Sequence, residues 1–138
     1  MNYKIQFTSP TETSVVESAI KLARKRTGRN EVIAFTNAFH GMSLGSLSLT
    51  ANRSHRHSFM PGGLTRLPYE GYMADQLKTV DLLEKILRDK SSDLDLPAAI
   101  ILETVQGEGG VNIAIIEWLM SLQEVARCYS IRIIVDDV

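Results

Sequence analysis

Apolar residues recur every three or four positions along several segments of the chain, a spacing that predicts amphipathic helices. These segments are residues 14–27, 75–88 and 115–129, with a shorter helix expected at 44–49. The first helix carries basic side chains near its end and is followed by Gly28, and both features are typical of a helix C-terminus. Ser14 and Glu17 have the spacing of a capping box, so we expect the helix to begin at this pair.

Short apolar runs between the helices predict strands. They are residues 3–8, which alternate weakly, and residues 32–35, 98–103 and 131–135. Because strands and helices alternate, we predict an α/β fold with a mostly parallel sheet and helices on both faces. Residues 51–68 show no periodicity and are expected to form a long exposed loop. No repeat or linker divides the 138 residues, which therefore form one domain or part of one.

Composition and charge narrow the range of functions. A hydrophobic content of 44% and a charged content of 22% are ordinary for a soluble globular protein. The formal net charge of −1 gives no reason to expect nucleic acid or an anionic membrane as partner. No signal peptide and no long apolar segment is evident, so we expect a cytoplasmic protein. The single cysteine, Cys128, is expected to be a buried or half-buried thiol in a reducing compartment.

Two loops carry candidate binding residues. Thr11, Glu12 and Thr13 precede the first long helix, where free N–H groups and the helix dipole favour a phosphate. The alternative is that these hydroxyls only cap the helix. Phe39 and His40 follow a strand and could stack on a flat ligand, or the phenyl ring could simply anchor the loop to the core.

Acidic residues mark the ends of the last two strands. Glu103 ends a buried strand, and Glu108 lies in the glycine-rich turn 106–110. Two interpretations are open: the carboxylates serve a function, or they are solvated side chains beside a flexible turn. This turn lacks the full dinucleotide-binding fingerprint and does not lead directly into a helix. Asp136 and Asp137 could bind a metal or act as an acid and base, or one of them could hold a protonated heterocyclic nitrogen. Neighbouring strand residues face opposite ways, which favours a single working aspartate.

His55 and His57 could ligate a metal ion, but no third ligand lies nearby in the sequence. Exposed loop histidines are the favoured interpretation, and we predict no metal site.

Taken together, these motifs resemble the class III pyridoxal-phosphate (PLP)-dependent aminotransferases. The resemblance rests on residues 39–41, 100–110 and 133–138, in this order and at these intervals, and covers nearly the whole chain. It implies a fold-type I large domain, PLP as cofactor, and transfer of an amino group. Residues 35–45 and 117–119 look most like the diaminobutyrate–2-oxoglutarate transaminases of ectoine synthesis. The resemblance then implies transfer from glutamate to aspartate semialdehyde, giving 2,4-diaminobutyrate and 2-oxoglutarate. A 4-aminobutyrate or acetylornithine type is the alternative within the class.

The resemblance also assigns roles to residues around the PLP ring. Phe39 would stack on the pyridine ring with His40 beside it, Asp136 would pair with the ring nitrogen, and Val138 would pack on the opposite face.

Further roles concern the phosphate and the substrate. Glu12 and Thr13 would form the phosphate-binding turn, although Glu12 stands where the family usually has glycine and adds negative charge there. Glu103 would belong to the active-site polar network. Glu108 would pair with an active-site arginine that has no match here.

The family's Schiff-base lysine lies downstream of the aspartate strand, beyond Val138. Residues 1–138 are therefore expected to be a partial PLP-binding large domain, without the N-terminal segment, the lysine region and the small C-terminal domain. We expect no catalytic residue in this chain and no activity from it alone, and the parent enzyme is expected to be a homodimer or a higher homo-oligomer. A remnant that binds PLP weakly or not at all, and a free-standing nucleotide-binding domain, remain as alternatives from other classes.

Overall fold

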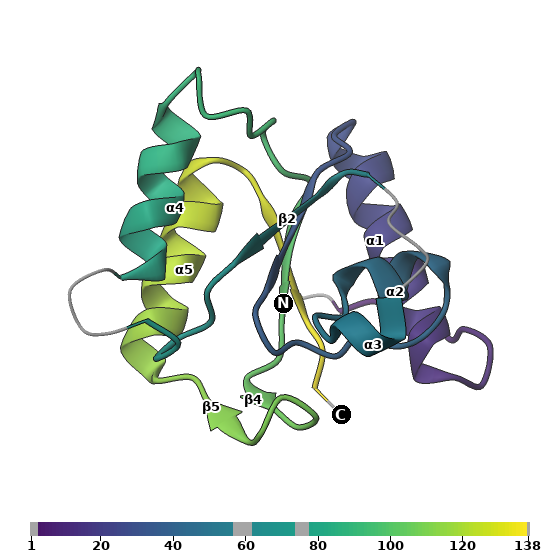
Figure 1. The fold of residues 1–138 in the computed structure, drawn as a ribbon. Helices are drawn as coiled ribbons and strands as arrows, with labels where there is room; N and C mark the ends of the chain where they lie inside the picture. The colour runs from purple at the N-terminus through teal and green to yellow at the C-terminus, as the bar shows by residue number, and fades with distance from the viewer. Residues whose placement is uncertain (1–2, 57–61, 74–77, 138) are drawn as a thin grey trace.

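The computed structural model describes residues 3–56, 62–73 and 78–137. Its centre is a four-stranded sheet in the order β2-β1-β3-β6, in which every neighbouring pair is parallel (Figure 1). These strands are β1 (Val32–Phe35), β2 (Leu64–Leu67), β3 (Ala99–Leu102) and β6 (Arg132–Val135). The predicted α/β class with a parallel sheet is confirmed.

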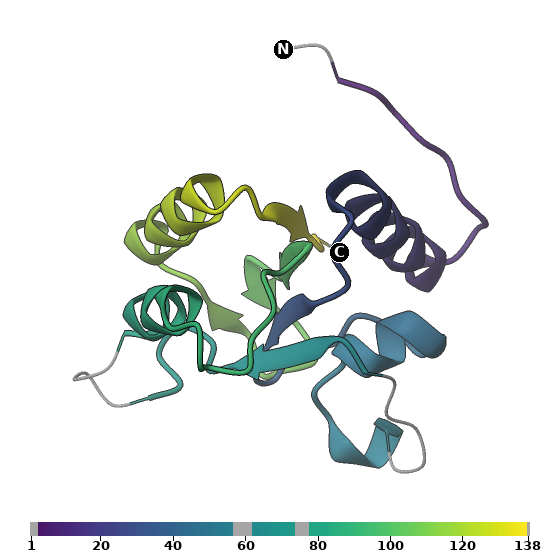
Figure 2. The same cartoon turned by 90° about the horizontal axis from the view of Figure 1, so that it is seen from above.

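Helices cover both faces of the sheet, as Figure 2 shows from above. They are α1 (Glu12–Thr27), α2 (Leu44–Leu49), α3 (Arg53–Arg56), α4 (Thr79–Arg88) and α5 (Ile116–Cys128). Alternate residues of β1 serve opposite cores, because successive strand side chains point to opposite faces. Ile33 and Phe35 pack with residues of α4 and α5, whereas Val32 and Ala34 pack with residues of α1 and α2.

An aromatic cluster joins the sheet to α5. The ring centroids of Phe35 and Trp118, and those of Tyr69 and Trp118, are 5.3 Å apart. The Tyr69 hydroxyl donates a hydrogen bond of 2.7 Å to the Glu103 carbonyl. Burial and the nearby Glu103 and Glu70 carboxylates raise the pKa of Tyr69 to about 12, so the hydroxyl remains a donor. This contact ties the segment after β2 to the end of β3.

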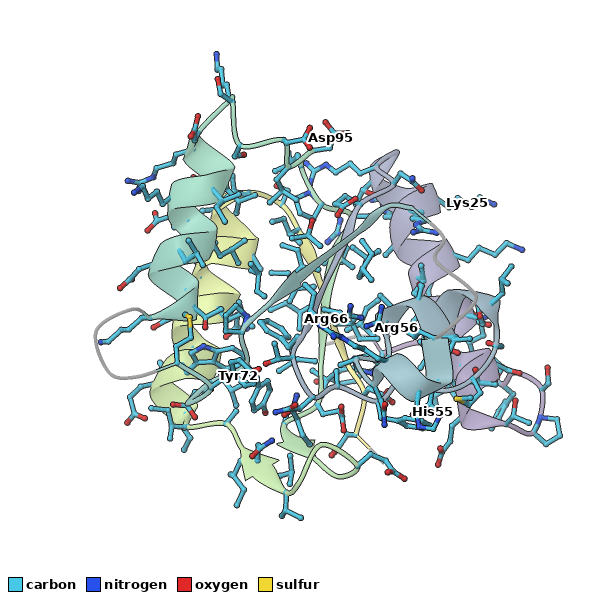
Figure 3. The ribbon with its side chains drawn as sticks, viewed as in Figure 1. Lys25, His55, Arg56, Arg66, Tyr72 and Asp95 are labelled. Atoms are coloured by element: carbon cyan, nitrogen blue, oxygen red, sulfur yellow. The ribbon has the colours of Figure 1, made fainter. Side chains whose placement is uncertain are left out.

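Helix α2 is held to the sheet at its C-terminal end by an arginine. The Arg66 guanidinium from β2 donates to the carbonyls of Ser48, Leu49 and Thr50 at 3.0–3.2 Å. Figure 3 shows Arg66 beside Arg56. Burial and the Arg56 charge lower the pKa of Arg66 to about 10, so Arg66 is still a cation near pH 7 and suits the carbonyl end of a helix.

The predicted elements at residues 32–35 and 44–49 are confirmed as β1 and α2 with these bounds. The prediction that Ser14 and Glu17 form a capping box is wrong, because α1 begins at Glu12, with Thr11 as its N-cap residue. The Ser14 hydroxyl bonds to the Thr11 hydroxyl at 2.7 Å, and the Glu17 carboxylate reaches donors of α2 instead of its own helix.

The strand expected at residues 3–8 and the uninterrupted loop expected at residues 51–68 are both wrong, because pairing between distant segments decides where strands form. Residues 3–8 form no strand and lead away from the body in Figure 2, and in the described chain no strand pairs with them. Within residues 51–68, α3 and β2 interrupt the expected loop, while residues 57–61 lie outside the described parts. β2 is a strand because it pairs with β1. Its Leu-Thr-Arg-Leu sequence alone does not predict a strand.

The remaining differences are small. The helix expected at 75–88 begins at Thr79 as α4, with residues 74–77 outside the described parts. Cys128, expected to be at least half-buried, is exposed at the last position of α5 because it lies on the solvent side of that helix. No helix in the described ranges is long and apolar enough to cross a membrane.

Arg29 connects the starts of β1, β3 and β6. Its Nη1 lies 3.0 Å from the Pro97 carbonyl and 3.2 Å from the carbonyls of Tyr129 and Ser130. These carbonyls precede β3 and β6, so one cation connects the starts of three parallel strands.

We predict that Arg29→Ala lowers the free energy of unfolding by about 1.5–3 kcal/mol, the usual range for hydrogen bonds to a charged group. Arg127→Ala is the matched control, because Arg127 forms an exposed ion pair with Glu124 on the surface of α5 and its loss should change stability little. Urea denaturation of both variants measures the difference. Equal effects would contradict the role given to Arg29.

Candidate functional site

The carboxyl ends of β1, β3 and β6 meet at one edge of the sheet, at the bottom of Figure 1. The segments that follow these strands, together with the N-terminus of α1, enclose a pocket of about 610 Å³. It contains every predicted site residue that the structure describes; Val138 lies outside the described residues. The lining residues are Thr11, Glu12, Thr13, Phe39, His40, Gly41, Glu103, Val105, Gly107, Glu108 and Asp136.

A histidine–aspartate pair forms the floor of this pocket. His40 Nδ1 lies 2.8 Å from Asp136 Oδ2, a contact between residues 96 positions apart. Asp136 is placed by the sheet, because its N–H donates to the Leu102 carbonyl at 2.9 Å and continues the pairing of β3 with β6. Asp136 lines the pocket and Asp137 does not, as is usual for neighbouring strand residues, whose side chains point to opposite faces.

His40 is held on three sides. Its side chain is buried, its N–H donates to Thr50 Oγ1 at 3.0 Å, and its Nδ1 faces Asp136. Its Nε2 is buried and has no hydrogen-bond partner among the described atoms. A buried ring nitrogen without a partner is costly, and a bound ligand could satisfy it.

Glu103 joins the two loops beside the pair. Its Oε1 accepts the Phe39 N–H at 3.0 Å, and its Oε2 accepts the Gly107 N–H at 3.2 Å. Burial, and to a lesser extent the Asp136 carboxylate, raise the pKa of Glu103, although the two N–H donors and His40 act in the opposite direction. The carboxylate therefore fixes the Phe39 loop to the glycine-rich turn.

Phe39 forms one wall of the pocket. Its ring meets the His55 ring edge-on, with centroids 5.9 Å apart and an angle of 73° between the planes. His55, labelled in Figure 3, comes from α3. In the described ranges no three histidine, cysteine or acidic side chains are grouped as metal ligands, and His57 lies outside those ranges.

The N-terminus of α1 forms a second wall of the pocket. Thr11 makes no side-chain capping bond, because its hydroxyl bonds to Ser14, so this turn has no side-chain cap competing for an anion. The Thr13 hydroxyl points elsewhere: it bonds to Ser43 Oγ at 2.7 Å and Ser46 Oγ at 2.5 Å. Any anion here would therefore meet backbone N–H groups rather than the Thr13 hydroxyl. Glu12 is exposed at the same turn.

Comparison with known proteins gives this geometry its context. The family described as Aminotransferase class-III matches residues 4–138. A diaminobutyrate–2-oxoglutarate transaminase of Vibrio cholerae is 51% identical over 140 residues, covering 100% of this chain and 34% of that protein. The chain belongs to the class-III aminotransferases. An uncharacterized aminotransferase of Sinorhizobium fredii is 53% identical over 140 residues, covering 100% of this chain and 31% of that protein. The chain thus spans about a third of the length of these curated relatives.

Solved transaminase structures share the fold of this class-III chain. An (S)-enantioselective ω-transaminase from Thermomicrobium roseum gives a TM-score of 0.75 at 28% identity, over 92% of this chain and 32% of that one. A PLP-bound amine transaminase from an uncultivated Pseudomonas species gives 0.76 at 26% identity, over 93% and 32%. The ornithine aminotransferase of Toxoplasma gondii gives 0.72 at 27% identity, over 91% and 29%. The roles assigned to individual residues stay predictions.

Sequence reasoning missed how the glycine-rich turn of this chain is built. It forms a hairpin of β4 (Val105–Gln106) and β5 (Asn112–Ile113), and, as the sequence indicated, it does not lead directly into a helix. Gln106 is fully buried, and its amide donates to the Thr36 carbonyl at 2.8 Å and accepts from Asn112 at 3.0 Å. Gln106 beside the glycines was the signal in the sequence for a buried polar contact. Its partner, the Thr36 carbonyl, is 70 positions away and could not be identified from the sequence.

Gly109 lets this hairpin pack against the β1 loop. A Cβ at position 109 would lie 2.3 Å from the Asn37 carbonyl oxygen, which is backbone and cannot swing aside. A Cβ at Gly107 would meet no atom within 4 Å.

We predict that Gly109→Ala displaces the hairpin and its Glu108, and lowers the free energy of unfolding by about 1–3 kcal/mol through overpacking. Gly107→Ala, two residues away, should change stability by less than about 0.5 kcal/mol. Thermal denaturation together with the amide NMR shifts of Glu108 tests both. Similar shifts in the two variants would rule out the close approach as the cause.

Proposed function

We propose that this chain forms the part of a class-III aminotransferase that binds PLP. One observation carries the proposal: a single pocket contains a helix N-terminus, an aromatic ring and a carboxylate held by a buried histidine. These groups match the phosphate, the pyridine ring and the ring nitrogen of PLP. The family membership supports this assignment.

The phosphate would lie at the N-terminus of α1. The 16-residue helix presents N–H groups with no side-chain cap, and its dipole favours a negative charge there. The exposed Glu12 works against this attraction, because its carboxylate carries the same sign as the phosphate. The described lining residues include no lysine or arginine, so the backbone of α1 would carry most of the attraction.

The ring would lie between Phe39 and the floor of the pocket. Asp136 uses Oδ2 for His40, and its second oxygen would accept a charge-assisted hydrogen bond from a protonated ring nitrogen. His40 fixes the direction of that carboxylate. PLP, when bound, withdraws electrons from the carbon that carries the transferred amino group. Glu103 would keep Phe39 in stacking position through the Phe39 N–H.

For the reaction, we propose transfer of an amino group from glutamate to aspartate semialdehyde, giving 2,4-diaminobutyrate and 2-oxoglutarate. The support is the identity of 51% and 49% to relatives named diaminobutyrate–2-oxoglutarate transaminase. An ω-transaminase and an ornithine aminotransferase among the structural neighbours support a second candidate, transfer from another ω-amino donor such as 4-aminobutyrate or acetylornithine.

We also propose that covalent attachment of PLP, and therefore turnover, requires a lysine outside residues 1–138. Among the residues that the structure describes, no lysine lines the pocket, and Figure 3 shows Lys25 pointing away from the body. The lysines of the chain are Lys4, Lys21, Lys25, Lys78, Lys85 and Lys90. Exposed apolar side chains such as Ile113, Ile116 and Met120 support self-association, as expected for a homo-oligomeric parent enzyme.

Equilibrium dialysis with PLP tests the proposed pocket. We expect the chain to bind PLP, and Asp136→Asn to weaken binding about tenfold to a hundredfold, because the bond to the ring nitrogen loses its charge. Asp137→Asn is the matched control and should leave binding unchanged, since Asp137 does not line the pocket. Failure of the natural chain to bind, or equal losses in both variants, would refute the proposal.

The charge of Glu12 gives a second prediction. Glu12→Gly should raise the affinity for PLP about two- to fivefold, because a like charge leaves the helix N-terminus. Affinity for pyridoxal, which lacks the phosphate, should stay the same. Glu12→Gln separates the effect of charge from that of size, and added salt should shrink the difference. An equal gain for pyridoxal would mean that Glu12 does not act on the phosphate.

A further inference from the structure

Glu17 lies on α1 outside the pocket, yet its carboxylate is the most heavily bonded one in the described structure. Its Oε1 accepts the N–H groups of Gly45 at 2.6 Å and Ser46 at 3.0 Å, and the Ser43 hydroxyl at 2.5 Å. All three donors belong to the beginning of α2. One carboxylate of α1 therefore holds the first turn of α2.

The chain makes room for this contact at Gly45. A Cβ at position 45 would lie 2.3 Å from Glu17 Oε2. Burial by itself raises the pKa of Glu17, but the bonds from Ser43, Ser46 and Gly45 and the charge of Arg24 outweigh it, so the net pKa is lowered. The carboxylate is accordingly ionised at neutral pH, the form in which it accepts these bonds most strongly.

Hydroxyl groups carry this contact back to the phosphate-binding turn. The Ser43 hydroxyl has one proton, which it donates to Glu17. The Thr13 hydroxyl, 2.7 Å from Ser43 Oγ, is therefore the donor in the bond between Thr13 and Ser43. Thr13 also bonds to Ser46 at 2.5 Å. The carboxylate thus orients the hydroxyls that join α2 to the N-terminus of α1.

The other end of α2 holds the loop that carries Phe39 and His40. Thr50, the residue that follows α2, accepts the His40 N–H at 3.0 Å and donates to the Gly41 carbonyl at 2.9 Å. A displacement of α2 would therefore move the Phe39 loop relative to Thr13. The two walls of the pocket are coupled through one short helix.

We propose that Glu17 is a positioning residue that sets the distance between the phosphate turn at Thr13 and the ring-binding loop at Phe39 and His40. The identity of the ligand, PLP, rests on the proposed function. The coupling between the Thr13 turn and the Phe39 loop rests only on the hydrogen bonds described above. Its loss loosens α2 and separates the walls without removing any group that would touch PLP.

Hydrogen exchange by NMR tests the coupling without any ligand. In Glu17→Gln and Glu17→Ala, we expect the amides of Phe39 and His40 to exchange about tenfold to a hundredfold faster, as loss of bonds to a charged group implies. The Ile101 amide in β3 should keep its rate, which controls for global destabilisation. Faster exchange confined to Gly45 and Ser46 would reduce Glu17 to a local cap of α2 and overturn the proposal.

Glu31→Gln is the matched control variant. Glu31 also accepts a hydroxyl bond, from Thr65 at 2.6 Å, but it lies before β1, away from the pocket. It should leave the exchange of Phe39 and His40 unchanged. An equal effect in this variant would mean that any lost carboxylate loosens the loop.

Binding supplies the second readout. Glu17→Gln should weaken PLP about tenfold and pyridoxal less than twofold, because only the phosphate bridges from the ring to α1. Equal losses for the two ligands would overturn the role given to Glu17. If the natural chain binds neither ligand, the proposed function fails, while the exchange rates still decide whether Glu17 couples the two walls.

Discussion

The parallel pairing of β1, β3 and β6 is the constraint on which the site depends. In a parallel sheet all strands deliver their carboxyl ends to the same edge, so three segments distant in sequence open onto one pocket. The register, with Ile100 opposite Ile133 and Leu102 opposite Val135, then fixes which aspartate faces inward. Asp136 meets His40 there because each follows a strand of the same sheet.

Burial makes the polar groups of this pocket interdependent. Glu103 is largely buried, and a buried carboxylate is tolerated only with its own donors. Those donors are the N–H groups of Phe39 and Gly107, so satisfying the charge also fixes the two loops that shape the pocket. His40 and Asp136 do the same for the floor. The hydrogen bonds that compensate for burying these charged groups also orient the residues proposed to hold PLP.

Sequence reasoning succeeded where local pattern dictates structure. The apolar run at residues 32–35 predicted β1 with its bounds, and the alternation of strands and helices predicted the parallel sheet. It failed where a distant partner decides. Glu17 looked like part of a capping box but turned to α2, whose N–H groups lie 28 and 29 positions away. β2 looked like loop because its strand character comes from pairing with β1.

We propose that PLP binds in the pocket at the carboxyl edge of the sheet, with its phosphate at α1 and its ring nitrogen at Asp136. The most direct measurement is the set of amide NMR shifts that change when PLP is added to the chain. We expect the amide shifts to change at residues 11–14, 39–41 and 136, and inorganic phosphate to reproduce only the changes at residues 11–14. Changes centred on the separate pocket beside Tyr69 and Trp118 would contradict it, and so would the absence of any change.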